Sequence, residues 1–214
     1  KTYKINELKF IEDQILNLLK EWKIECIDSL LFHKAKDINK EFIREWALDL
    51  RRKGYIKNLG ISAYLDDLRK TIFYENFDKV QIPFSCVDNR ALNKIKELDI
   101  FNKSNHLISA RSVYLQGILV CPMNKIPKFV SNTENEEIKK WKEKLNMYNL
   151  TPQEYCLKYV ASENKIKEII IGISSLTELK DLITYSNIQS NIKFKLLRPP
   201  KLREKTLDPR LWNI

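Results

Sequence analysis

Short apolar segments alternate with helical patterns along this chain, and this alternation limits the fold more than any other feature. We expect strands at residues 24–33, 55–62, 79–84, 106–111 and 168–173. The first of them is apolar on both alternating faces, which is typical of a strand buried between two layers. Strands that are separated by helices form right-handed βαβ units and a parallel sheet. The sequence therefore predicts an α/β fold.

The helical segments are recognised by apolar residues that recur on one face. Residues 8–22 carry such a pattern, and further helices are expected at residues 37–53, 65–73, 89–98, 151–162 and 177–189. Asp37 is expected to cap the helix at 37–53, and Gly54 to end it. No linker rich in Pro, Gly or Ser divides the chain, so we expect a single domain over residues 1–214.

Composition narrows the class of protein. The net charge of +10 is spread without a dense arginine or aromatic cluster, so no nucleic-acid partner is expected. The charge indicates either a solvated surface or a field that attracts an anionic small molecule. The four cysteines lie far apart, as in reduced intracellular proteins, and we find neither a leader nor a membrane-spanning apolar run. A cytoplasmic protein without a membrane partner is expected.

His33 is the first candidate for chemistry. It lies at the carboxyl end of the first expected strand, where barrel enzymes carry their active sites. The alternative is a polar strand end with no chemical role. Two Gly-Ile-Ser sequences, at residues 60–62 and 172–174, also follow apolar segments. Such a turn lets the backbone approach a ligand. The alternative is an ordinary turn with a serine cap, which is common enough that the tripeptide alone does not indicate a ligand site.

Five motifs occur in a specific order, namely IDSLLFH at 27–33, KGYIKNLGIS at 53–62, VQIPF at 80–84, ARSVYLQGIL at 110–119 and IIIGISS at 169–175. Together, over residues 8–182, they resemble the aldo-keto reductase family. The resemblance implies a (β/α)8 TIM barrel of aldo-keto reductase type that binds NADPH or NADH. It also implies an NAD(P)H-dependent oxidoreductase that reduces an aldehyde or ketone to an alcohol by hydride transfer.

The resemblance assigns roles to individual positions. His33 matches the catalytic-pocket histidine that orients the substrate carbonyl, and Ser62 and Gln81 match residues that hold the nicotinamide carboxamide. The other implied cofactor-binding residues, from the diphosphate and nicotinamide to the adenosine phosphate and ribose, are Arg111, Ser112, Leu115, Gln116, Gly172, Ser174, Ser175 and Asp181. No metal is implied. Backbone satisfaction by Gln81 and helix capping by the serines are the alternatives.

The chain departs from the family pattern at two positions. Ala63 stands where the family has an Asn beside the first cofactor serine, so one amide contact to the cofactor is missing. Glu178 stands where NADPH-preferring members often carry an Arg, and a carboxylate there repels a 2'-phosphate. The choice between NADPH and NADH therefore stays open.

The family's catalytic Asp, Tyr and Lys belong to strands and a helix that would precede Lys1. Five expected strands against the eight of a closed barrel indicate that the first three βα units are lacking here. Such a chain has two open sheet edges through which it can associate. The alternative function is a noncatalytic aldo-keto reductase-like nucleotide-binding or regulatory module.

Two further segments frame the expected pocket. Residues 120–150 are long for a connection between strand and helix, which is typical of a lid, and residues 190–214 form a C-terminal tail. A surface elaboration with a structural Trp141 explains the first segment equally well.

Overall fold

The computed structural model describes residues 5–68, 77–98, 106–187 and 197–212. The chain divides into two compact units. The first consists of residues 1–82 and 91–108, and the second of residues 83–90 and 109–214. The expectation of a single domain over the whole chain stays a prediction.

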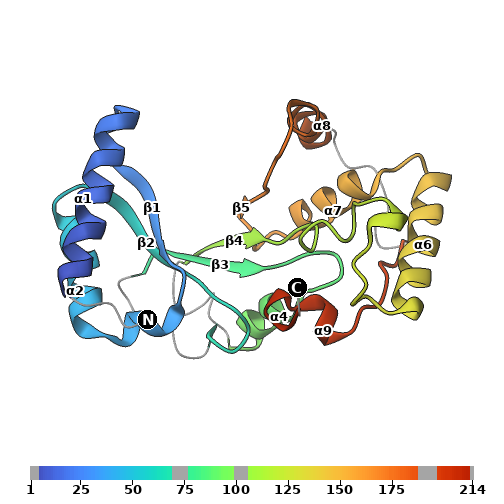
Figure 1. Cartoon of the computed structure of the whole chain (residues 1–214), viewed down its shortest axis with the longest axis horizontal. Coiled ribbons are helices and arrows are strands. Elements are labelled where there is room, and N and C mark those ends of the chain that lie inside the picture. The colour runs from blue at the N-terminus through green and yellow to red at the C-terminus, as the bar shows by residue number, and fades with distance from the viewer. Residues whose placement is uncertain (1–4, 69–76, 99–105, 188–196, 213–214) are drawn as a thin grey trace. The chain divides into compact units, whose positions relative to one another are not determined.

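In the described residues, five strands follow one another in chain order in one sheet, and Figure 1 labels each of them. They are β1 (Ile27–Phe32), β2 (Ile56–Ser62), β3 (Lys79–Pro83), β4 (Leu107–Arg111) and β5 (Glu168–Ile169). The pairs β1 with β2, β2 with β3 and β4 with β5 are parallel. Helices separate most of these strands along the chain, so the predicted α/β class is confirmed.

The fifth strand is much shorter than predicted. The expected strand at 168–173 is wrong beyond Ile169, although Ile170 still donates its backbone N–H to the carbonyl of Ala110 at 2.8 Å. The reason is its partner, because Ala110 pairs with Ile169 and β4 ends one residue later, at Arg111. Residues 171–173 therefore have no neighbouring ladder to join, and they are free to line a cavity.

Two helices of the first unit precede strands as expected. Helix α1 (Ile5–Trp22) buries Leu8, Ile15 and Leu19 on one face. Helix α2 (Glu41–Arg52) is followed by Gly54, whose φ of 78° is the left-handed conformation of a helix end.

The predicted capping role of Asp37 is wrong. Asp37 lies inside a short 3-10 helix (Ala35–Asn39), and Lys40 is the N-cap of α2 without a side-chain capping bond. The buried carboxylate of Asp37 instead pairs with the Lys40 ammonium at 3.0 Å. The cation of Lys40 is the partner that this buried carboxylate needs, because burial of a charge without a partner costs several kcal/mol.

The other α-helices of the described residues are α4 (Arg90–Glu97), α6 (Asn132–Met147), α7 (Pro152–Ala161), α8 (Leu176–Asn187) and the short α9 (Glu204–Leu207). Ser131 and Thr151 cap α6 and α7 through their side chains, and the expected start of α7 is confirmed. The expected helix at 65–73 lies largely outside the described residues.

The segment at 120–150 is packed into the second unit through α6. Trp141 is buried, and its ring meets that of Tyr155 on α7 edge to face, with 5.5 Å between centroids. This contact supports the structural alternative for Trp141. The lid function of the segment stays a prediction.

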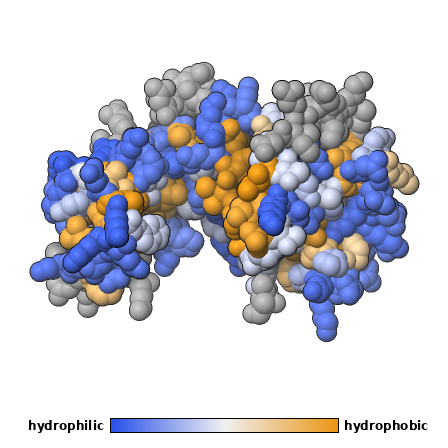
Figure 2. Space-filling view, turned by 90° about the horizontal axis from the view of Figure 1, so that it is seen from above, coloured by the Kyte–Doolittle hydropathy of each residue, from blue (hydrophilic) through white to orange (hydrophobic). Residues whose placement is uncertain are grey.

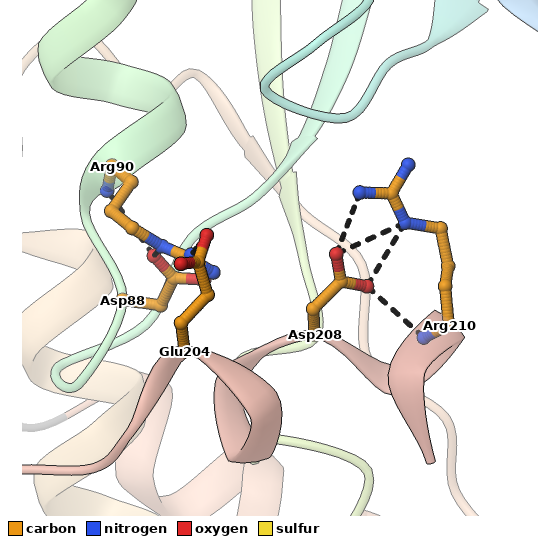
Figure 3. Close-up of polar contacts among 5 residues, drawn as sticks. All are labelled: Asp88, Arg90, Glu204, Asp208 and Arg210. Atoms are coloured by element: carbon orange, nitrogen blue, oxygen red, sulfur yellow. Dashed lines mark hydrogen bonds and ion pairs between the residues drawn. The ribbon is translucent and has the colours of Figure 1, made fainter. Parts of the chain in front are cut away.

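The C-terminal tail is held to the second unit by charged side chains at several points. Figure 3 shows Arg90 between the buried Asp88, at 2.9 Å, and Glu204 of α9, also at 2.9 Å. The same view shows a contact within the tail itself, in which Asp208 is paired with Arg210 at 2.6 Å. The tail is further joined to α6 where Arg203 pairs with Glu134 at 2.7 Å. The described part of the tail, residues 197–212, is therefore an integral part of this unit.

Candidate functional site

The second unit contains a cavity of about 640 Å³ that is built where β4 and β5 end. Six of the predicted cofactor-binding residues line it, namely Arg111, Ser112, Gln116, Gly172, Ser174 and Asp181. They come from two segments about sixty residues apart in the sequence, because the parallel neighbours β4 and β5 end at the same edge of the sheet. Parallel sheets place ligand sites at this edge.

The loop after β4 has an unusual backbone. Ser112, Leu115 and Gln116 have φ values of 60°, 48° and 52°, and Gly117 follows with 90°. Left-handed conformations are uncommon for residues other than glycine, and they concentrate at ligand sites. The loop turns tightly, since the N–H of Leu115 donates to the carbonyl of Ser112 at 2.9 Å. The buried Leu115 side chain anchors this turn and is not among the cavity-lining residues.

The segment after β5 forms another part of the wall. Gly172 and Ser174 line the cavity, and a Cβ added to Gly172 would meet no atom within 4 Å. Ser175 lies outside the lining and accepts a bond from the N–H of Glu178 at 3.1 Å, as a helix cap does. The capping alternative therefore holds for Ser175, while Ser174 faces the cavity.

Sequence reasoning missed several lining residues, including Tyr114, Gln153 and Tyr185. Tyr114 stands in the motif at 110–119, but the sequence does not indicate that its side chain lies in the wall of the cavity. Burial raises the pKa of Tyr114 to about 12, so its hydroxyl is a neutral donor at ordinary pH. Gln153 and Tyr185 come from two other helices, and only packing brings them to the cavity.

The remaining predicted residues belong to the first unit. Ser62 and Gln81 are direct partners across β2 and β3, and the Ser62 hydroxyl donates to the Gln81 amide oxygen at 3.1 Å. His33 follows β1 directly and is exposed. Ser62 and Gln81, which were both expected to bind the nicotinamide carboxamide, are therefore in contact with each other, and the His33 side chain is accessible to solvent.

The two Gly-Ile-Ser sequences differ in structure. Gly60 lies inside β2, and a Cβ there would come within 2.3 Å of the Lys79 carbonyl oxygen and 2.6 Å of the Leu31 side chain. Its close approach is therefore to neighbouring strands, and the expectation of a ligand there is wrong for Gly60. Gly172, in contrast, is open and lines the cavity.

Within the described ranges, no group of three or more His, Cys, Asp and Glu side chains is arranged to hold a metal ion. In the same part of the chain, every helix is too short or too polar to cross a membrane. None of the four cysteines forms a disulfide. The sulfurs of Cys86 and Cys156 are nevertheless in contact, 3.6 Å apart.

Known proteins resemble this chain both in sequence and in fold. The sequence model of the Aldo/keto reductase family matches residues 6–194. Similar solved structures include the apo and holo forms of aldo-keto reductase AKR11C1 from Bacillus halodurans, each with a TM-score of 0.70 and 16% identity. The match covers 94% of this chain and 72% or 71% of those chains. A search of curated proteins finds no significant match. The chain belongs to the aldo/keto reductase family of oxidoreductases.

Proposed function

We propose that the protein is an NAD(P)H-dependent oxidoreductase that reduces an aldehyde or ketone to an alcohol by hydride transfer. The observation that carries the proposal is the cavity, because six residues to which the family resemblance gives cofactor roles line one space. Its volume, about 640 Å³, lies within the range of sites for small molecules and cofactors. The left-handed loop at 112–117 and the open space at Gly172 leave room for backbone approach to a ligand.

Each unit, taken by itself, has side chains whose chemistry suits a nicotinamide dinucleotide. Arg111 supplies a flat cation that can stack on a ring or pair with a phosphate, and Ser112 and Gln116 supply polar groups in the left-handed loop. Ser62 and Gln81 offer a hydroxyl and an amide in contact with each other, which suits a carboxamide partner. The bound cofactor would supply the hydride, and His33 would orient the carbonyl oxygen.

We also propose that the full barrel includes three further βα units, which carry the catalytic Asp, Tyr and Lys. Strands β1 and β5 lie at the two ends of the sheet order. Large apolar side chains near each of them in the sequence are exposed, among them Trp22 at 63% in the first unit and Leu176 at 67% in the second. Figure 2 shows apolar residues gathered on the surface. Exposed apolar groups of this size suggest surfaces that other elements, or a second copy, would cover.

We expect the protein to bind a small carbonyl compound, and we expect it to bind neither nucleic acid nor a membrane. We propose a cytoplasmic location, which is supported by four cysteines that form no disulfide.

Titration with NADH and NADPH, followed by protein fluorescence, tests the function. We expect saturable quenching by at least one of them. A Gly172→Leu variant puts bulk into the cavity and should weaken this quenching, whereas Lys139→Leu on the exposed face of α6 is the control. Lack of saturable quenching in the unmodified protein would contradict the proposal. Cofactor binding without turnover of any aldehyde or ketone, measured on the full-length natural protein, would favour the noncatalytic module.

A further inference from the structure

Two buried thiols are in contact in the second unit. The sulfur of Cys86 lies 3.6 Å from the sulfur of Cys156, although the two residues are 70 positions apart in the sequence. Cys86 belongs to the loop between β3 and α4, and Cys156 belongs to α7. The two residues are 6% and 0% exposed. Packing of the unit, rather than the local sequence, therefore brings these two nucleophiles together.

The other two cysteines have different neighbours. The thiols of Cys26 and Cys121 are directed at backbone carbonyl oxygens of residues close by in the sequence, at 3.7 and 3.6 Å. At Cys86 and Cys156, each sulfur instead has the other as its partner. An S–S bond is about 2.0 Å long, so the two sulfurs would have to approach each other by roughly 1.5 Å. Cys86 lies in a loop, and loops adjust by such an amount more readily than helices do.

The two thiols differ in their reactivity. Burial raises the pKa of Cys156 well above its usual value, and the neighbouring Cys86 raises it further. Lys142 of α6 opposes this effect, because its ammonium favours the thiolate of Cys156. Cys86 is slightly exposed, whereas Cys156 is fully buried. An oxidant in solution therefore reaches Cys86 first, and Cys156 is placed to react with the product.

We propose that Cys86 and Cys156 are a thiol oxidation site, at which hydrogen peroxide converts the pair into a reversible disulfide. The Cys86 thiolate attacks one peroxide oxygen, the O–O bond breaks, and Cys86 becomes a sulfenic acid. The other oxygen leaves as hydroxide and becomes water with the proton that Cys86 lost. The Cys156 sulfur then attacks the Cys86 sulfur, so that the S–S bond forms and the S–O bond breaks. The departing oxygen takes the Cys156 proton and leaves as a second water, and a thiol reductant reverses the link.

The disulfide would join several parts of the second unit. The loop with Cys86 leads directly to Arg90, which pairs with Glu204 of the C-terminal tail at 2.9 Å. Helix α7 carries Gln153 about one turn before Cys156, and Gln153 lines the cavity. The link therefore restrains an element of the cavity wall when peroxide is present. Cytoplasmic disulfides are commonly of this transient, redox-dependent kind. The inference does not depend on the proposed cofactor site.

Packing alone is the competing explanation. A buried cysteine behaves as a small apolar side chain, and two of them in contact need no chemical role. Thiols that are only packed would not link in the folded protein, because structural buried cysteines are inert. Whether the link forms before unfolding therefore separates the two explanations.

The test treats the folded, full-length natural protein with hydrogen peroxide and identifies linked peptides by mass spectrometry without reduction. It compares the unmodified protein with Cys86→Ala, Cys156→Ala and Cys26→Ser. Cys26 is exposed and lies in the first unit, so it reports oxidation of a thiol outside the pair. We expect a link between Cys86 and Cys156 in the unmodified protein and in Cys26→Ser, with loss of two hydrogen atoms and reversal by dithiothreitol. Cys156→Ala should instead retain a sulfenic acid at Cys86 that a sulfenic-acid trapping reagent labels.

Thermal unfolding measures the effect of the link on stability. The oxidised protein should unfold at a temperature about 5 to 10 °C higher than the reduced one, because a cross-link over a long segment restrains the unfolded chain. Cys86→Ala, treated with peroxide in the same way, should show no such rise and controls for oxidation elsewhere.

Absence of the link in folded protein, at a dose of peroxide that oxidises Cys26 completely, would overturn the inference. A link that forms only in denaturant, or that lowers the unfolding temperature, would do the same. Either result would show that the folded chain does not accommodate the disulfide.

Discussion

Glu134 connects the start of α6 to the C-terminal tail, and its removal should destabilise the second unit. Its carboxylate accepts the backbone N–H and the hydroxyl of Ser131 at 3.0 and 2.8 Å, which completes a capping box. It also accepts the backbone N–H of Arg203 at 2.8 Å and pairs with the Arg203 guanidinium at 2.7 Å. The Glu134 side chain is only 4% exposed, so these partners replace nearly all of its hydration.

The size of the effect follows from the pKa. Burial by itself raises the pKa of Glu134, but the bonds from Arg203 and Ser131 outweigh it and lower the pKa from 4.5 to about 2. At roughly 1.4 kcal/mol per pKa unit, this corresponds to about 3 kcal/mol of stability. The Arg203 side chain is 54% exposed, and solvent screening reduces the expected value to about 2 kcal/mol.

The lowered pKa of Glu134 determines how its contribution to stability changes with pH. Since the folded pKa is lower than the unfolded one, the stabilisation is fully present above pH 4.5 and is lost as the pH falls from 4.5 through about 2. Glu134→Gln removes the charge while keeping an amide oxygen for Ser131. The variant should therefore be less stable at pH 7 by about 2 kcal/mol, and the difference should shrink on acidification.

Urea unfolding of the unmodified chain and Glu134→Gln, followed by circular dichroism between pH 7 and pH 3, measures this difference. Glu137→Gln is the matched control, because Glu137 is exposed on the same helix. A difference that stays constant down to pH 3, or no difference at pH 7, would refute the assignment of the stabilisation to the ionised carboxylate.

Two other predictions concern Gly60 and His33. Gly60→Ala should destabilise the first unit by about 2 kcal/mol or more, because the added Cβ would lie 2.3 Å from the Lys79 carbonyl oxygen. Gly172→Ala should leave the stability nearly unchanged, because nothing lies within 4 Å of its added Cβ. Equal unfolding midpoints for the two variants would contradict this prediction. His33→Ala in the complete enzyme should lower turnover of a carbonyl substrate on the order of tenfold to a thousandfold with little change in cofactor affinity. Unchanged turnover would favour the alternative, in which His33 is a polar residue at a strand end with no chemical role.

The strand positions were predictable because their signal is local. A strand such as β2 was expected at 55–62 and lies at Ile56–Ser62, since a short apolar run between polar segments has few other ways to bury its side chains. Ser112 and Ser174 were assigned cofactor roles through the family resemblance, and Ser174 also stands in a Gly-Ile-Ser sequence. Both follow such runs directly, and the carboxyl ends of parallel strands meet at one edge.

Features that depend on distant partners were not predictable. The length of β5, for example, is limited by where β4 ends. The pair of Glu134 and Arg203 joins residues that are far apart in the sequence. No local pattern contains such information, because it arises only when separate elements pack.

The sequence by itself determined the α/β class, the order of the strands and the positions of candidate residues at strand ends, since periodicity and turn residues act over a few neighbours. The tertiary structure decided which candidates share a cavity. It separated Gly60, packed against neighbouring strands, from Gly172, open to the cavity, although both stand in the same tripeptide. It also turned the Glu178 carboxylate onto the Ser174 donors. The physical reason is that burial and hydrogen-bond partners are properties of the packed chain, in which identical local sequences meet different neighbours.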